Sequence, residues 1–292
     1  SPARSRCVSD RRAARPSRTR RSARLLQECL RLPLVLDGVL SRARSRALAK
    51  TRGNHPAVPR AIDAVGVWAR RGRAAGERAA AAAFADLLFT PQARSLIHVF
   101  FAQAAARKNP WSHAARRVAR VAVLGAGLMG SGIAEVSAAA GLSVRLKDER
   151  LDLASAGREG IVEALERRVG KGLTQAESDG AAARLTAVAA YAELAEADVT
   201  IEAVPEDLGL KRAVLAEVEA VTAPGHLFAS NTSAIRIEEL AAGAERPEAV
   251  VGMHYFSPVQ KMPLLEVVVT RRTEEWAVAT ATALGLRQGK SV

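Results

Sequence analysis

The amino-acid sequence predicts an α/β protein in which a doubly wound parallel sheet is preceded by a helical connector. Three observations lead to this fold class. Short apolar runs alternate with segments of helical periodicity from residue 120 onward, as in parallel sheets with helices on both faces. Hydrophobic residues make up 49% of the chain and charged residues 25%, which is a globular composition. No apolar stretch reaches the ~20 residues that a membrane helix requires.

The net charge of +13 is concentrated at the start of the chain. Residues 1–50 hold 14 of the 43 Lys and Arg but only 3 of the 30 acidic residues, so the remainder is nearly neutral. We interpret residues 1–50 as an Arg-rich, poorly ordered connector, with a polyanion-binding arm or a transit peptide as alternatives. The only cysteines, Cys7 and Cys29, exclude a disulfide scaffold and favour a reducing compartment.

Residues 51–116 are predicted to form a helical linker. Apolar residues recur at helical spacing over 58–68, and the alanine run 79–83 has high helix propensity. The pair Thr90-Pro91 is typical of a helix start, with threonine as the cap and proline in the first turn. Residues 96–101 give the helix that follows an apolar face.

The segment 117–292 is predicted to form the α/β domain. Short runs rich in β-branched residues are typical of buried parallel strands, and we expect strands at 121–124, 143–148, 199–204, 227–230, 250–254 and 264–269. Between them, helical periodicity predicts helices over 128–140, 151–173 and 208–221. Strands that alternate with helices imply right-handed crossover connections in one sheet.

A glycine motif, GAGLMG at 125–130, lies between the first predicted strand and its helix. In this strand–turn–helix context the motif indicates a Rossmann-type dinucleotide site. Gly125 would permit the tight turn, and Gly127 would let a pyrophosphate approach the backbone. Gly130 would let helix and strand pack closely, while the helix N-terminus supplies free N–H groups. A glycine-rich turn without any ligand is the alternative.

An acidic residue, Asp148, closes the second predicted strand. Its carboxylate would accept hydrogen bonds from ribose hydroxyls and repel a 2′-phosphate, which favours NAD over NADP. Two neighbouring cations, Lys147 and Arg150, weaken this preference slightly because either one could bind the 2′-phosphate of NADP.

A second group of polar residues follows the later strands. Residues 230–233, with the sequence SNTS, come after an apolar strand, His254 ends the next one, and Glu266 lies 12 residues further on. A carboxylate among leucine and valine is costly unless it has a partner. A histidine oriented by such a carboxylate is the arrangement that a general base needs. The alternative is that His254 has only a structural role. No Cys/His cluster suggests a metal site.

These motifs resemble the NAD-dependent L-3-hydroxyacyl-CoA dehydrogenase family from about Arg117 to Lys290. The resemblance rests on the segments VAVLGAGLMGSGIA, IEAVPEDLGLK, FASNTSAI and GMHYFSPVQKMPLLEVV, in the family's order and spacing. The HYFSPV version resembles multifunctional fatty-acid oxidation α subunits. Two upstream segments, AKTRGNHPAVPRAIDAV and FADLLFTPQARSLIHVFFAQ, resemble the connector that joins the enoyl-CoA hydratase half of those subunits to the dehydrogenase half.

The resemblance implies roles for individual residues. His254 would remove the proton of the 3-hydroxyl group, Glu266 would orient His254, and Ser233 would bind the reacting oxygen and contact the cofactor. The positions that match the family's other NAD contacts are Met129, Asp148, Val204, Pro205, Glu206, Lys211 and Ser257. At one of them the chain departs from the family, because proline replaces a bulky apolar residue and removes a backbone N–H from that turn.

The resemblance therefore implies oxidation of (S)-3-hydroxyacyl-CoA to 3-oxoacyl-CoA with NAD, within a β-oxidation protein that also has enoyl-CoA hydratase (lyase) activity. An acyl-CoA substrate and a thiolase β subunit are the implied partners, with no nucleic acid and no transmembrane segment. A bacterial cytoplasm suits the composition, and a mitochondrial matrix is the alternative location.

The family continues past Val292 into a helical substrate domain, so we expect a C-terminally truncated dehydrogenase domain. Three other functions stay open: a non-catalytic NAD-binding fragment, a related 6-phosphogluconate-like or short hydroxyacid dehydrogenase, and a polyanion-binding protein.

Overall fold

The computed structural model describes residues 32–292, and the predictions made for residues 1–31 lie outside the described residues. The chain divides into two compact units between Phe101 and Ala102. The sequence placed this boundary near residue 116. The difference arises because residues 102–116 bond to the α/β unit, where the side-chain amide of Asn109 donates to a backbone carbonyl of the last helix (2.9 Å).

The first unit is helical over its described residues, as the sequence predicts for 51–101. Its helices are α2 (Pro33–Thr51), α3 (Ala57–Arg71), α4 (Arg73–Leu88) and most of α5 (Pro91–Ala105). The hydroxyl of Thr90 accepts from the N–H of Ala93 (3.2 Å) and so caps α5. Helix α2 differs from the poorly ordered connector expected there. Pro33 lies in the first turn of α2, where a missing N–H costs nothing.

Helix α2 is held against α3 by ion pairs between Arg44 and Asp63 and between Arg70 and Asp37. The unit buries little apolar surface of its own. Its described helices bury Leu36, Ala64, Gly66 and Gly76, and the apolar residues 96–101 of α5 are exposed.

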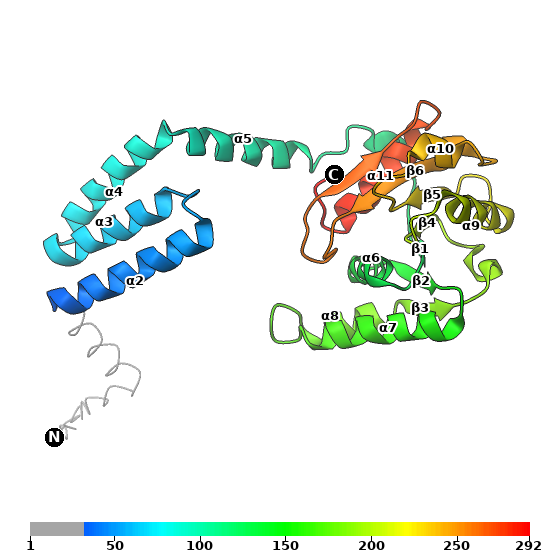
Figure 1. Ribbon diagram of the computed structural model, residues 1–292, viewed down its shortest axis with the longest axis horizontal. Helices are drawn as coiled ribbons and strands as arrows, with labels where there is room; N and C mark the ends of the chain where they lie inside the picture. Colours follow the sequence, from blue (N-terminus) through cyan, green and yellow to red (C-terminus); the bar gives the residue numbers. More distant parts are fainter. Residues whose placement is uncertain (1–31) are drawn as a thin grey trace, which may run out of the picture. The chain divides into compact units, whose positions relative to one another are not determined.

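The second unit is built on one sheet of seven strands in the order β3-β2-β1-β4-β5-β6-β7 (Figure 1). The strands are β1 (Arg120–Leu124), β2 (Ser143–Lys147), β3 (Leu185–Val188), β4 (Val199–Glu202), β5 (Leu227–Ser230), β6 (Val250–Tyr255) and β7 (Leu265–Val268). Strands β1 to β6 are parallel, which confirms the predicted fold class. Strand β7 runs antiparallel to β6, and no signal in the sequence gave this direction.

Helices cover both faces of this sheet, and each face has its own hydrophobic core (Figure 1). One core contains residues of α6 (Leu128–Ala139), α7 (Leu151–Glu166), α8 (Gln175–Ala182) and α11 (Glu275–Arg287); the other contains residues of α9 (Leu208–Val221) and α10 (Ile237–Ala241). Along β1, side chains alternate between the cores: Val121 and Val123 face one, Ala122 and Leu124 the other. This alternation is why the strand is apolar throughout.

The predicted helix over 151–173 is shorter in the structure, because α7 ends at Glu166. Gly170 and Gly172 follow with φ values of 74° and 110°, which a helix does not accommodate. The sequence also gave no indication of α8, β3, α10 or α11. Among the described residues, no helix is both long and apolar enough to cross a membrane.

Candidate active site

The candidate site lies where the sheet changes winding direction. The chain leaves β1 toward β2 and β3, then returns to β4 on the other side of β1. In open α/β sheets this switch point, at the carboxyl ends of the strands, is where ligands bind. The glycine motif occupies the turn between β1 and α6 here. Gly125 has a φ of 91°, and a Cβ on Gly130 would lie 1.7 Å from the carbonyl oxygen of Gly125.

The carboxylate of Asp148 lies against this turn. It accepts hydrogen bonds from the N–H groups of Ala126 (2.6 Å) and Glu149 (2.7 Å). The two cations expected to weaken the preference for NAD have other partners. Lys147 lies 4.0 Å from the centre of the Tyr191 ring, and Arg150 is paired with Asp152.

A pocket of about 390 Å³ opens at the carboxyl ends of β4, β5 and β6. It gathers seven of the residues predicted as site residues: Met129, Val204, Glu206, Lys211, Ser233, His254 and Ser257. The other residues that line it are Ala203, Asn231, Tyr255 and Phe256. Pro205 and Glu266 do not line the pocket; Glu266 instead contacts His254.

The His254–Glu266 pair forms because β7 turns back along β6, which places the two residues directly opposite each other. Nδ1 of His254 lies 2.8 Å from Oε2 of Glu266. With Nδ1–H donating to the carboxylate, Nε2 keeps its lone pair and is able to accept a proton. The sequence argument assumed that the glutamate was buried, and this was wrong, because its side chain is 51% exposed. Strand register, not burial, brings the pair together.

Below the pocket, a buried ion pair connects three segments. The carboxylate of Glu202, which is 0% exposed, accepts from both Nζ of Lys211 (2.9 Å to each oxygen) and the hydroxyl of Ser230. Lys211 also lies 3.3 Å from Oε2 of Glu206. Glu202 was missed from the sequence, although a glutamate that ends an otherwise apolar strand is a usable signal, since a buried carboxylate requires a partner.

Glu206 connects this ion pair to the loop that carries Ser233. Its carboxylate accepts from Thr232 Oγ1 (2.5 Å) and from the N–H groups of Ser233 and Ala234 (3.1 Å each). Partial burial acts to raise the pKa of Glu206, but these hydrogen bonds and the charge of Lys211 outweigh it and lower the pKa. Glu206 is therefore ionised at neutral pH and holds the loop in place.

Comparison with known proteins identifies the family of this domain. The family model described as "3-hydroxyacyl-CoA dehydrogenase, NAD binding domain" matches residues 120–292, which is more than half of the chain. The chain belongs to this family. The resemblance stated from the motifs and the predicted NAD cofactor are thereby confirmed, and the second unit is an NAD-binding domain of the family.

Three solved structures each match 60% of this chain. The 3-hydroxybutyryl-CoA dehydrogenase of Escherichia coli is 39% identical, with a TM-score of 0.59 and 38% of its own length covered. FadB2 of Mycobacterium tuberculosis is 42% identical, with a TM-score of 0.57 and 62% covered. The dehydrogenase part of multifunctional enzyme 1 from C. elegans is 26% identical, with a TM-score of 0.55 and 40% covered. The chain thus spans less than two thirds of each relative.

The residues of this domain fit the family's cofactor. A Cβ atom added to Gly127 would have no neighbouring atom within 4 Å. The backbone at the N-terminus of α6 is therefore open to a pyrophosphate. Asp148 lies at the end of β2, where the family's ribose contact is expected. Met129, Val204 and Ser257, which the sequence predicts as NAD contacts, line the pocket. The individual roles of these residues stay predictions.

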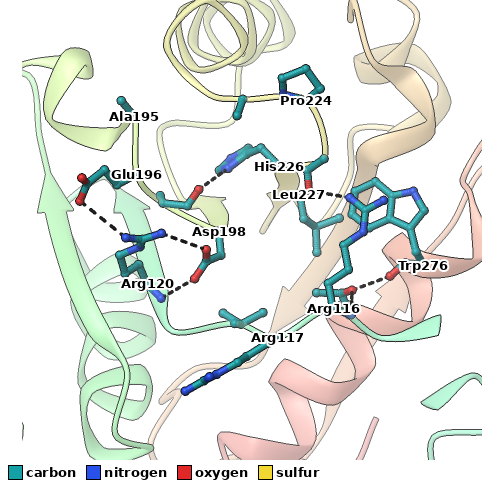
Figure 2. Close-up of a pocket in the computed structure, with 15 residues that line it drawn as sticks. Arg116, Arg117, Arg120, Ala195, Glu196, Asp198, Pro224, His226, Leu227 and Trp276 are labelled. Carbon is teal, nitrogen blue, oxygen red and sulfur yellow. Dashed lines mark hydrogen bonds and ion pairs between the residues drawn. The ribbon is translucent and has the colours of Figure 1, made fainter. Parts of the chain in front are cut away.

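The opposite, amino edge of the sheet carries a second hollow, of about 240 Å³ (Figure 2). Arg120 pairs here with Glu196 and Asp198. Asp198 accepts from the N–H of Arg120 (2.8 Å), and the Arg120 guanidinium lies 3.6 Å from the same carboxylate. The guanidinium of Arg116 stacks 3.5 Å from the centre of the Trp276 ring. Nothing in the sequence singled out this hollow.

The histidine of this hollow, His226, is buried, and its Nδ1 lies 2.8 Å from the carbonyl oxygen of Ala197 (Figure 2). Burial lowers its pKa to about 4, so it is neutral at physiological pH.

Proposed function

We propose that the carboxyl-edge pocket oxidises (S)-3-hydroxyacyl-CoA to 3-oxoacyl-CoA with NAD as the hydride acceptor. One observation carries this proposal. His254, whose Nδ1 lies 2.8 Å from Oε2 of Glu266, lines the same pocket as Ser233 and as Met129 of the glycine turn. A base beside a dinucleotide site is what alcohol oxidation requires, because a proton and a hydride must leave the same C–OH group.

The residues of the chain supply the proton chemistry. Nε2 of His254 would take the proton of the 3-hydroxyl group while the C3–H bond breaks. Glu266 would stabilise the imidazolium that forms, as carboxylates do beside catalytic histidines. Ser233 would donate a hydrogen bond to the C3 oxygen. NAD, when bound, would accept the hydride from C3, which carries two electrons and one proton, while His254 would take the second proton from the hydroxyl group.

The direct test combines binding with turnover in the 292-residue chain. NADH and NADPH are titrated in parallel while nucleotide fluorescence is followed, and NADH formation from (S)-3-hydroxybutyryl-CoA is then measured. We expect saturable binding that favours NADH, together with NADH formation that depends on the hydroxyacyl-CoA. Binding without any turnover would favour the alternative of a non-catalytic NAD-binding chain.

We further propose that this activity serves fatty-acid β-oxidation in a multifunctional protein that also hydrates enoyl-CoA. Two findings support this: a helical unit precedes the NAD-binding domain, and one structural relative is named as the dehydrogenase part of a multifunctional enzyme. The test is the hydration of a 2-enoyl-CoA by the natural gene product, and capture of a thiolase subunit by the same protein. Absence of both would remove the multifunctional context and leave the dehydrogenase proposal intact.

A further inference from the structure

Asn231 follows β5 and lines the pocket, and its side chain bonds to β6. Its backbone N–H donates to the carbonyl oxygen of Glu202 (2.9 Å), which continues the β4–β5 ladder by one residue. Its side-chain Oδ1 accepts from the N–H of Tyr255 (2.9 Å), the residue next to His254. Asn231 therefore has a fixed side-chain position between the loop of Ser233 and the strand of His254.

The orientation of this amide follows from donor and acceptor chemistry. The backbone N–H of Tyr255 is a donor, so only the oxygen of the amide can face it. Tyr255 is itself immobilised, since its hydroxyl donates to Gln288 (2.6 Å), whose own amide donates to Ser137 (2.8 Å). Burial raises the pKa of the Tyr255 phenol, so it stays a neutral donor. The Asn231 amide cannot rotate without breaking its bond to Tyr255.

The other end of the amide, Nδ2, makes no hydrogen bond to any residue in the described range 32–292. Asn231 is half-buried and lines the pocket together with Ser233 and His254. A donor placed in a hollow, with its own position fixed, is preorganised for an acceptor atom of a ligand. Two further polar groups belong to residues that line the pocket: the hydroxyl of Ser233, and Nε2 of His254, which is an acceptor.

We infer that Asn231 is a ligand-binding residue whose Nδ2–H donates a hydrogen bond to a carbonyl oxygen in the pocket. The ligands of the proposed reaction offer two candidate acceptors: the oxygen of the nicotinamide carboxamide and the C3 oxygen of a 3-oxoacyl thioester. Either contact would fix its ligand relative to Nε2 of His254, because Asn231 is tied to the neighbouring residue Tyr255. The inference rests on the proposed function, since it requires a nicotinamide or a 3-oxoacyl group in this pocket.

The test uses two substitutions of Asn231 in the 292-residue chain. Asn231→Asp keeps an acceptor oxygen for the N–H of Tyr255 and loses the donor, while Asn231→Ala loses both without adding charge. Asn109→Asp is the matched control. It makes the same chemical change where Asn109 donates to Ala279 (2.9 Å), in contact with α11 and away from the residues that line the pocket. Thermal melting, NADH affinity and the affinity of the NADH-loaded chain for acetoacetyl-CoA are measured for each variant.

We expect Asn231→Asp to melt close to the unsubstituted chain and to lose about tenfold in affinity for one ligand, the value of one hydrogen bond to a ligand. Loss of NADH affinity assigns the bond to the carboxamide, and loss of acetoacetyl-CoA affinity alone assigns it to the C3 oxygen. Asn231→Ala should lose a similar factor, and Asn109→Asp should bind both ligands normally.

Two results would overturn the inference while the proposed function stands. The first is unchanged affinity for both ligands in Asn231→Asp. The second is normal affinity in Asn231→Ala with a loss only in Asn231→Asp, which would reveal a charge effect instead of a lost donor. If the unsubstituted chain binds neither ligand, the proposed function and the inference fall together.

Discussion

The two edges of the same sheet carry hollows with opposite chemistry. At the carboxyl edge, Nε2 of His254 and Nδ2 of Asn231 have no partner among residues 32–292, although each side chain is fixed at its other end. At the amino edge, Arg120 and Asp198 bond to each other and to the backbone (Figure 2). The unused polar atoms at the carboxyl edge face an open pocket, whereas at the amino edge Arg120 and Asp198 satisfy each other and the unpaired Nε2 of His226 is buried.

The largest effect should come from His254→Ala at the carboxyl edge. Loss of the general base should lower turnover by roughly 10²- to 10⁴-fold, while NADH affinity changes little because the base contacts the substrate. Steady-state NADH formation and a fluorescence titration measure the two quantities. The matched control is His226→Asn at the amino edge, which should keep normal turnover. Equal losses of turnover in both variants would show that the two edges do not differ in their importance for catalysis.

The next effect concerns acid stability and depends on His226. Burial depresses its pKa from 6.5 to about 4 in the folded chain. Between these two pH values the unfolded chain binds a proton that the folded chain does not. The free energy of unfolding is therefore undiminished above pH 6.5 and decreases as the pH falls toward 4. One such group contributes up to about 3 kcal/mol over this range.

His226→Asn should remove this part of the acid dependence, since asparagine can still donate to Ala197 but does not titrate. Urea unfolding at several pH values between 7 and 4.5 gives the free energy of unfolding for both chains. If the free energy of unfolding depends on pH identically in both chains, His226 is not the group responsible for the acid dependence.

A smaller loss is expected from Asp198→Ala. The carboxylate accepts from the N–H groups of Ala119 and Arg120, both at 2.8 Å, at the start of β1. Removing it should lower the free energy of unfolding by about 1–2 kcal/mol and leave NADH affinity unchanged. Asp198→Asn keeps one acceptor oxygen and should lose less. A clear loss of NADH affinity would instead mean that the amino edge takes part in binding.

The smallest effect is predicted for Asp148→Ala at the carboxyl edge. It removes a ribose acceptor and leaves the N–H of Ala126 without its partner at 2.6 Å. We expect NADH affinity to fall about five- to tenfold and the margin over NADPH to narrow. Parallel titrations with both nucleotides measure this margin. An unchanged margin would argue against the ribose contact.

Much of the α/β domain was predictable because its signals are local. A buried parallel strand must be apolar on both faces, so the run Val121–Leu124 is recognisable without its neighbours. The glycine turn is equally local, because a φ of 91° at Gly125 and the close approach at Gly130 exclude side chains. Strand β3 escaped prediction because four residues, two of them half-exposed or exposed, do not form a distinct apolar run.

The site itself was predictable in part. The residue types of the His254–Glu266 pair are those of an oriented base, but the sequence reasoning gave the wrong cause, since Glu266 is exposed. The sequence did not predict the ion pair between Glu202 and Lys211 or the hydrogen bond from the N–H of Tyr255 to the side chain of Asn231. The first joins β4 to the helix α9, and the second joins β5 to β6; no periodicity in the sequence indicates such a contact.

The sequence by itself determined six of the seven strands, the glycine turn and the cofactor class, and it predicted His254 as the base. Only the tertiary structure decided that β7 runs antiparallel to β6, that Glu266 therefore faces His254, and that Tyr255 fixes the amide of Asn231. The physical reason is range. Backbone conformation and apolar periodicity depend on neighbours along the chain, whereas strand direction and register depend on the packing of the whole sheet.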